Sequence, residues 1–207
     1  YNVVEVGSFR GESLLQIQQK SAGGLHYIFE PLPSYHRKLV RTFGHHRCPI
    51  MRIALSNYDG VALFNFVETN PQFSGLKFWR YGKYESAEKY FIRVRMLDTL
   101  LPAHHPVHLI KIEAEGGELS ILQGAVETLQ RYKPIVLFEY RRPPARFYHQ
   151  HSTMLYELLT TCGLEINTMS RWRRGKAGLT RLNFLKQRRW RWNCYFVAYP
   201  PHLRQIP

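Results

Sequence analysis

Three glutamates follow a short apolar run near the middle of the chain, in the stretch LIKIEAEGGELSIL at residues 109–122. Glu113, Glu115 and Glu118 lie between a strand-like segment and an amphipathic one. Carboxylates placed there can act as general bases or orient a substrate through hydrogen bonds. They can also offset the macrodipole at the start of a helix, which stabilises the helix by about 0.3–1 kcal/mol. Both interpretations stay open for all three residues.

A second polar motif ends the first strand-like segment, in the sequence VVEVGSFRGES. Gly7 permits a tight turn, and Gly11 opens a helix-like stretch and allows close backbone approach. The N–H groups at the start of a helix bind anionic groups such as carboxylates. Glu30 ends the next strand, where a carboxylate can accept hydrogen bonds from ribose hydroxyls. Turn and acid together predict a nucleoside ligand.

The first turn also indicates which nucleoside binds. Pyrophosphate-binding turns follow the pattern G-x-G-x-x-G, and Phe9 interrupts that pattern here. Glu5 would repel a diphosphate but suits an ammonium group. S-adenosylmethionine carries an amine, a carboxylate, a sulfonium and a ribose, so it fits these residues better. A solvated strand end is the alternative interpretation for Glu5 and for Glu30.

Apolar strands alternate with helical stretches along the chain. We expect strands at residues 1–7, 26–30, 49–55, 61–67, 90–96, 107–112, 134–140, 164–169 and 193–199, and helices at 11–21, 34–43, 118–131 and 154–162. A turn signal at residues 57–60 predicts that 61–67 is the hairpin partner of 49–55. Nearly continuous apolar strands separated by helices indicate a parallel sheet covered on both faces, within a single domain over residues 1–207. Such sheets bind ligands beyond the carboxyl ends of their strands.

Six short motifs, taken in their order along the chain, resemble the FkbM-type S-adenosylmethionine-dependent methyltransferases. They are residues 5–11, 30–31, 54–60, 94–100, 110–118 and 134–139, and the most specific is IKIEAEGGE. Glu5 and Glu113 stand where the family usually has Asp. The resemblance implies an α/β, Rossmann-like class I methyltransferase fold: a mostly parallel seven-stranded sheet with helices on both faces and an antiparallel last strand.

The resemblance also implies a cofactor site at the ends of the first three strands. Backbone groups of the first loop would hold the methionine part of S-adenosylmethionine, an acid at the second strand would bind the ribose, and residues 55–57 would border the adenine. The cofactor-binding candidates are Glu5, Gly7, Ser8, Gly11, Glu30, Ser56 and Asn57.

The acceptor implied by the resemblance is a hydroxyl on a sugar, glycan or small natural product. An alcohol nucleophile benefits from a base within hydrogen-bond reach. Glu113 is the first candidate for that base or for orienting the substrate, and Glu115 is the second catalytic candidate. Glu118 and Glu139 are expected on the substrate side. Clustered carboxylates also suit Mg²⁺, but the sequence lacks a second, well-spaced acid set, so we predict no metal site.

Positive charge gathers late in the chain, whose formal net charge is +14. Residues 166–207 hold ten Lys and Arg and no acid. Within residues 171–192 the cations, including Arg188 and Arg189, alternate with aromatic residues. That mixture suits an anionic acceptor, and it also suits single-stranded nucleic acid. An RNA methyltransferase and a non-catalytic cofactor-binding module are therefore the alternatives.

Three cysteines, Cys48, Cys162 and Cys194, are far apart and odd in number. This predicts free thiols in a reducing cytosol rather than a disulfide framework or a zinc site. No apolar run in the sequence approaches the roughly 18 residues that span a bilayer. No charged-then-apolar leader precedes the first strand. We expect a cytoplasmic protein.

Overall fold

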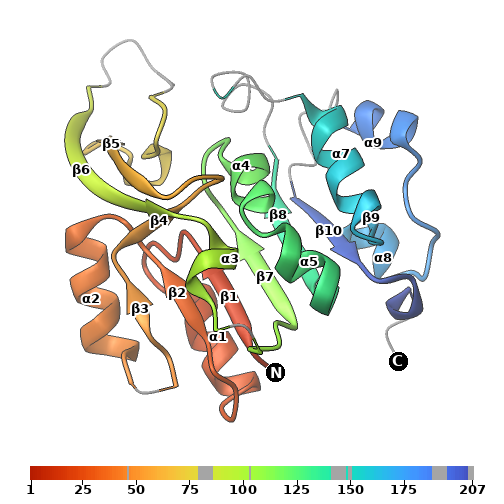
Figure 1. Cartoon of the computed structure of the whole chain (residues 1–207), viewed down its shortest axis with the longest axis horizontal. Coiled ribbons are helices and arrows are strands. Elements are labelled where there is room, and N and C mark those ends of the chain that lie inside the picture. Colours follow the sequence, from red (N-terminus) through yellow and green to blue (C-terminus); the bar gives the residue numbers. More distant parts are fainter. Residues whose placement is uncertain are drawn as a thin grey trace.

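A computed structural model of the chain contains two β-sheets with helices packed around them (Figure 1). It describes residues 1–45, 47–78, 86–102, 104–140, 148, 151–187 and 195–204. Within those ranges the larger sheet has seven strands in the order β3-β2-β1-β7-β8-β10-β9. They are β1 (Val3–Val6), β2 (Tyr27–Phe29), β3 (Ile50–Met51), β7 (Leu109–Ile112), β8 (Ile135–Glu139), β9 (Glu165–Thr168) and β10 (Tyr195–Tyr199). In this described sheet β10 alone runs opposite to the other six strands, which confirms the expected fold class.

Helices cover both faces of the larger sheet. On one face lie α1 (Glu12–Lys20), α2 (Pro33–Phe43) and α8 (Met169–Trp172), followed at the chain end by η2 (Pro201–Leu203). On the other lie α3 (Leu97–Leu100), α4 (Glu118–Gln123), α5 (Val126–Tyr132), α7 (Ser152–Thr161) and α9 (Arg181–Gln187). Side chains alternate along a strand, so Val4 and Val6 join the main core while Glu5 faces α1. Over the described ranges, no helix is long and apolar enough to cross a membrane.

The smaller sheet corrects two sequence predictions. It consists of β4 (Ile53–Leu55), β6 (Glu88–Arg95) and β5 (Gly60–Phe66), with β6 in the middle, and η1 (Pro71–Phe73) follows β5. The expected strand at 49–55 is broken at Arg52 into β3 and β4, which belong to different sheets. The expected hairpin between 49–55 and 61–67 is also wrong. Asp59 in the turn instead accepts a hydrogen bond from Met96 N at 2.7 Å and pairs with Arg95, which directs β5 onto β6.

The expected helix at residues 118–131 is two helices, α4 and α5. At the break, a Cβ added to Gly124 would lie 2.0 Å from the carbonyl oxygen of Ser56. Asp98 accepts hydrogen bonds of 2.9 and 3.0 Å from two backbone N–H groups in the first turn of α5. Because of this break, α5 begins as a separate helix with its own cap. The absence of a side chain at Gly124 also lets the segment after β4 pack against the α4–α5 junction.

Candidate functional site

A cavity of about 360 Å³ lies where strands of the larger sheet end beside the smaller sheet. Five of the candidate site residues from the sequence analysis line it, at the ends of β1, β2, β7 and β8: Gly7, Glu30, Glu113, Glu115 and Glu139. Six other named residues are described but do not line it: Glu5, Ser8, Gly11, Ser56, Asn57 and Glu118. The fold thus brings four predicted carboxyl groups around one space.

Gly7 brings the end of β1 against the end of β7. Its φ is +79°, and a Cβ added there would lie 2.0 Å from the carbonyl oxygen of Glu113. The backbone N–H of Glu113 donates to Val6 O at 3.0 Å. Glycine is required because both the left-handed conformation and the close approach exclude a side chain. This contact places the backbone of Glu113, and with it the Glu113 side chain, beside the first loop.

Phe9 is a lining residue whose role the sequence analysis missed. Its φ of 48° is rare for a bulky residue. Its backbone N–H donates to Glu30 Oε2 at 3.0 Å, and its ring packs on Tyr35 with centroids 4.6 Å apart. The interrupted glycine pattern was the available signal, since a bulky residue in that turn must find other contacts to hold it. The first loop is therefore fastened to the end of β2.

Glu30 is 4% exposed and receives a backbone hydrogen bond on each carboxylate oxygen. Phe9 N donates to Oε2 and Leu32 N donates to Oε1, both at 3.0 Å. Burial raises the pKa of Glu30 to about 7, against the opposing effect of these two bonds. A carboxylate oxygen has two lone pairs. Each oxygen can therefore still accept a hydrogen bond from a ligand in the cavity.

Lys111 joins two of the predicted acids. Its Nζ lies 3.2 Å from Glu5 Oε1 and 3.1 Å from Glu113 Oε2. Glu5 is fully buried and also accepts a hydrogen bond from Ser13 Oγ on α1. Glu5 therefore balances a lysine inside the fold, and one oxygen of Glu113 is held by a cation. The sequence analysis missed Lys111 because the pairing of Glu5 with Lys111 across β1 and β7 depends on strand register.

Glu118 lies beneath the loop that carries Glu113 and Glu115. It is 2% exposed, and its Oε1 accepts hydrogen bonds from Ala114 N at 3.3 Å and Gly116 N at 3.1 Å. Burial raises the pKa of Glu118 to about 8. The residue expected on the substrate side thus contacts the backbone of the site rather than the cavity.

The remaining cofactor candidates make contacts outside the cavity lining. Ser56 is buried, and Asn57 Nδ2 donates to Gln123 Oε1 at 3.0 Å. A Cβ added to Gly11 would lie 2.6 Å from the Phe43 ring, so Gly11 serves the packing of α1 against α2. Ser8 is buried, and its Oγ has no hydrogen-bond partner among the described residues. Leu55, next to Ser56, does line the cavity.

The far wall of the cavity comes from the insertion after β5 and from Tyr148. Residues 71–76 line the cavity, and Asn65 Nδ2 holds this segment by donating to Gly75 O at 3.1 Å. Tyr148 also lines it, and its hydroxyl accepts a hydrogen bond from Lys77 N at 3.2 Å. Burial raises the pKa of Tyr148. Because the insertion shows no clear periodicity, no sequence pattern predicts this wall.

A second hollow of about 200 Å³ adjoins the cavity. The two share Glu113, Glu139 and Tyr195, and the hollow is also lined by Lys111, Leu137 and Met169. The carboxyl ends of β7 and β8 therefore border both spaces. Within the described part of the chain, no group of three or more His, Cys, Asp and Glu side chains is placed to hold a metal ion.

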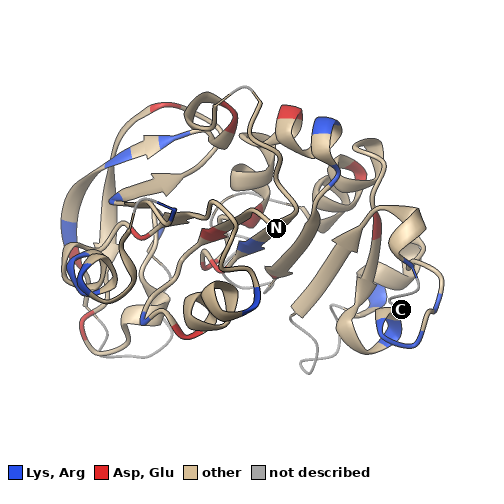
Figure 2. Cartoon of the chain, turned by 90° about the horizontal axis from the view of Figure 1, so that it is seen from below, with Lys and Arg blue, Asp and Glu red and all other residues tan. Residues whose placement is uncertain are grey.

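Charge is distributed unevenly around this site. Figure 2 shows Lys and Arg grouped beside the C-terminus and at the opposite end of the molecule, and both acidic and basic positions between them. The described lining of the main cavity contains four glutamates and neither Lys nor Arg. A lining of this composition favours a cationic ligand over an anionic one. Arg188 and Arg189, the substrate-side cations of the sequence analysis, lie outside the described residues.

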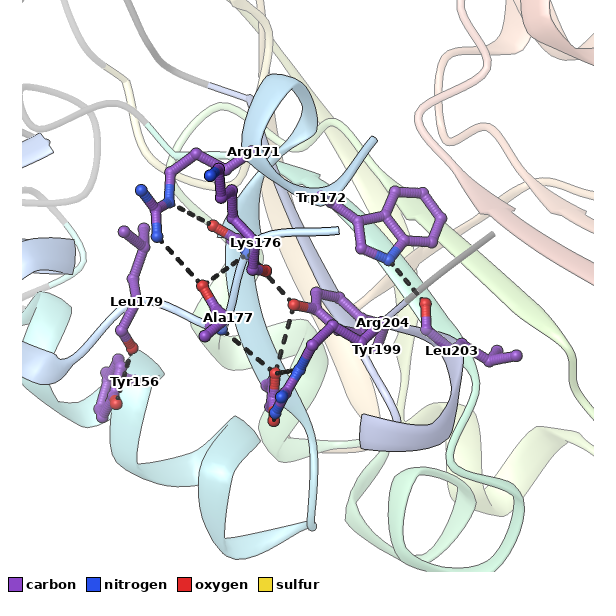
Figure 3. Close-up of polar contacts among 12 residues, drawn as sticks. Tyr156, Arg171, Trp172, Lys176, Ala177, Leu179, Tyr199, Leu203 and Arg204 are labelled. Carbon is purple, nitrogen blue, oxygen red and sulfur yellow. Dashed lines mark hydrogen bonds and ion pairs between the residues drawn. The ribbon is translucent and has the colours of Figure 1, made fainter. Parts of the chain in front are cut away.

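Residues 171–192 form the basic segment of the chain. Its described part is held by hydrogen bonds and ring contacts to neighbouring parts of the protein (Figure 3). Arg171 Nε donates to Asn167 Oδ1 at 3.0 Å, and Arg171 also donates to Ala177 O at 3.1 Å. Trp172 is 7% exposed, stacks on Tyr199 and donates from Nε1 to Leu203 O at 3.0 Å. Trp172 is therefore a core residue and does not offer a face for stacking a nucleic-acid base.

The chain is similar in sequence to one protein family and in fold to solved structures. Residues 5–166 match the model of the methyltransferase FkbM domain. A crystal structure of methyltransferase FkbM from Methylobacillus flagellatus KT superposes with a TM-score of 0.55 at 18% identity, covering 96% of this chain and 44% of that one. A precorrin-6y C5,15-methyltransferase from Geobacter metallireducens GS-15 gives a TM-score of 0.44 at 10% identity, covering 96% of this chain and 78% of that one. No curated protein matches the sequence.

Proposed function

We propose that this chain, which belongs to the FkbM methyltransferase family, transfers a methyl group from S-adenosylmethionine to a hydroxyl of a sugar, glycan or small natural product. The observation that carries the proposal is the meeting of Gly7, Glu30 and Glu113, from the ends of three strands, around one cavity of about 360 Å³. This is where open parallel sheets bind ligands.

The cavity suits the proposed cofactor at several points. Glu30 has lone pairs available for ribose hydroxyls, and Leu55 supplies an apolar surface near an adenine. Ser8 Oγ of the first loop and Glu5 Oε2 of β1 are buried polar atoms without hydrogen-bond partners among the described residues, but neither residue lines the cavity. The described lining holds glutamates and neither Lys nor Arg, which favours a sulfonium cation over an anionic ligand. The cofactor, when bound, would supply a methyl group activated by that sulfonium.

Glu113 is the residue that we propose for contact with the acceptor. Lys111 engages Oε2 of Glu113, so the carboxylate has a fixed orientation and Oε1 is available to accept a hydrogen bond from a hydroxyl. A positioned acceptor can supply most of the catalysis when the leaving group is already good. Glu113→Gln should therefore bind the cofactor with unchanged affinity while lowering transfer to any acceptor that the wild type methylates.

The first experiment is calorimetry of the full chain with S-adenosylmethionine. We expect micromolar binding by the wild type and at least a tenfold weaker affinity for Glu30→Ala. Glu12→Ala is the matched control, since Glu12 is an exposed acid in the first turn of α1. Absence of binding by the wild type, or equal binding by Glu30→Ala, would count against the proposed cofactor.

We also propose a reducing, cytoplasmic setting, which the thiols support. Cys48 and Cys162 are both free and buried, and Cys194 lies outside the described residues. Burial raises the pKa of both thiols, which disfavours the reactive thiolate. Unchanged cofactor binding in strong thiol reductant is the expected result, and loss of binding there would contradict this setting.

A further inference from the structure

The loop between β7 and α4 has an unusual backbone for a segment that lines a site. Glu115 has φ 44° and the next residue, Gly116, has φ 97°. Two consecutive left-handed residues, one of them not glycine, persist only where surrounding contacts enforce them. Ala114, Glu115 and Gly117 of this loop all line the cavity. Some group must therefore hold the loop from the side opposite the cavity.

Glu118 is in the right place to do so. It is the first residue of α4, yet its side chain turns back under the loop that precedes the helix. Its Oε1 accepts hydrogen bonds from the backbone N–H groups of Ala114 and Gly116, which flank the strained Glu115. Glu118 itself is 2% exposed and does not line the cavity. Its influence on a ligand must therefore pass through the loop backbone.

We propose that Glu118 is a positioning residue, which holds loop 113–117 in the conformation that presents Glu113 and Glu115 to the cavity. It acts as a buried hydrogen-bond acceptor for two loop amides, not as a charge that contacts the substrate. This assigns different tasks to the three glutamates of the segment: two face the cavity and the third supports them. The effect on ligand binding rests on the proposed function, whereas the effect on the loop does not.

The charge state of Glu118 supports a role as a neutral acceptor. Burial raises its pKa to about 8, and Glu115 adds in the same direction. Tyr148, which lines the cavity, is close enough to interact electrostatically with Glu118. At neutral pH the group is mostly protonated, and a protonated carboxyl has the same shape as an amide. Glu118→Gln is therefore a matched replacement that keeps an acceptor oxygen.

Amide hydrogen exchange of the full chain without ligand tests the effect on the loop. We expect wild type and Glu118→Gln to protect the Ala114 and Gly116 amides equally, and Glu118→Leu to speed their exchange at least tenfold with helix cores unchanged. Glu127→Gln and Glu127→Leu serve as controls, because Glu127 is an exposed acid in the first turn of the neighbouring helix α5. Normal protection in Glu118→Leu, or a loss of protection in Glu118→Gln equal to that in Glu118→Leu, would overturn the proposal.

Calorimetry with S-adenosylmethionine then tests the effect on the site. We expect Glu118→Leu to bind at least tenfold more weakly and Glu118→Gln to match the wild type. Failure of the wild type to bind S-adenosylmethionine would count against the proposed function but leave the exchange result standing. Exposed loop amides with full ligand affinity in Glu118→Leu would overturn the positioning role.

A pH series covers the case in which Glu118→Leu does not fold. A raised pKa means that the closed loop loses stability as pH rises from the ordinary carboxyl range to about 8. The protection factors of the Ala114 and Gly116 amides should therefore decline over that window in the wild type and stay level in Glu118→Gln. Identical pH profiles for the two proteins would overturn the proposal without the leucine variant.

Discussion

Lys111 Nζ lies 3.1 Å from Glu113 Oε2, and the same nitrogen lies 3.2 Å from Glu5 Oε1. One cation therefore links the strand that carries the first loop with the strand that carries the candidate catalytic acid. Glu5 is fully buried, so Lys111 both compensates that buried charge and fixes the orientation of Glu113. The cofactor side and the acceptor side of the proposed site share one electrostatic anchor.

Lys111→Met should destabilise the protein because it leaves the Glu5 carboxylate buried without its cation. Breaking a buried ion pair by removing one partner costs about 3–5 kcal/mol, and we expect about 3 kcal/mol since Lys111 is partly exposed. Urea unfolding measures this loss. Glu5→Gln in the same chain should restore part of the stability. A loss below about 1 kcal/mol in the single variant would show that the pair is not a stabilising anchor.

Gly7→Ala should disturb both the fold and the site. The new Cβ would lie 2.0 Å from the carbonyl oxygen of Glu113, at a φ of +79°. The left-handed conformation alone costs about 1–2 kcal/mol for a residue with a side chain, and relief of the clash must move β7 away from β1. We expect lower stability in urea and weaker binding of S-adenosylmethionine.

Gly23→Ala is the matched control for Gly7→Ala. A Cβ at Gly23 would have nothing within 4 Å, so stability and binding should be unchanged. If both alanine variants behave like the wild type, the proposed close packing of β1 against β7 is wrong.

The sequence predicted the parts of this site that depend on local pattern. Apolar runs placed six strands of the larger sheet, and the seventh, β3, lies within the longer strand expected at 49–55. Acids at strand ends predicted Glu30, Glu113 and Glu139 on the cavity. Both follow from the alternation of side chains and from the common edge that parallel strands share. The family resemblance supplied the antiparallel last strand, which no local pattern requires.

What the sequence could not predict depends on contacts between distant segments. Arg52 breaks one apolar run between two sheets because β4 pairs with β6, which comes much later in the chain. The partnership of Lys111 with Glu5 requires the β1–β7 register. Glu118 has the same residue type as Glu115, and only burial reverses its role. In each case the residue type was visible, but the neighbour that decides its role was not.

Glu30 and Glu118 should make the protein less stable as the pH rises, which is the opposite of the usual effect of a carboxylate. Burial raises the pKa of Glu30 to about 7 and of Glu118 to about 8. Each group therefore contributes stability that is fully present below the ordinary carboxyl pKa of about 4.3 and is lost as pH rises through the folded value. We expect the unfolding free energy of the wild type to fall from about pH 5 to about pH 8. The double variant Glu30→Gln, Glu118→Gln should show a flatter profile, and equal slopes would contradict these assignments.

Trp172→Ala tests whether the basic segment is core or nucleic-acid surface. Trp172 is 7% exposed, packs on Val197 and Tyr199 and bonds to Leu203 O, so its truncation should cost about 3–5 kcal/mol in urea unfolding. Arg173→Ala, an exposed neighbour, should leave stability nearly unchanged. Filter binding with single-stranded RNA should give equal affinity for wild type and the folded Trp172→Ala protein. A specific loss of RNA affinity at unchanged stability would instead mean that Trp172 leaves the core to stack on bases, and would restore the RNA methyltransferase alternative.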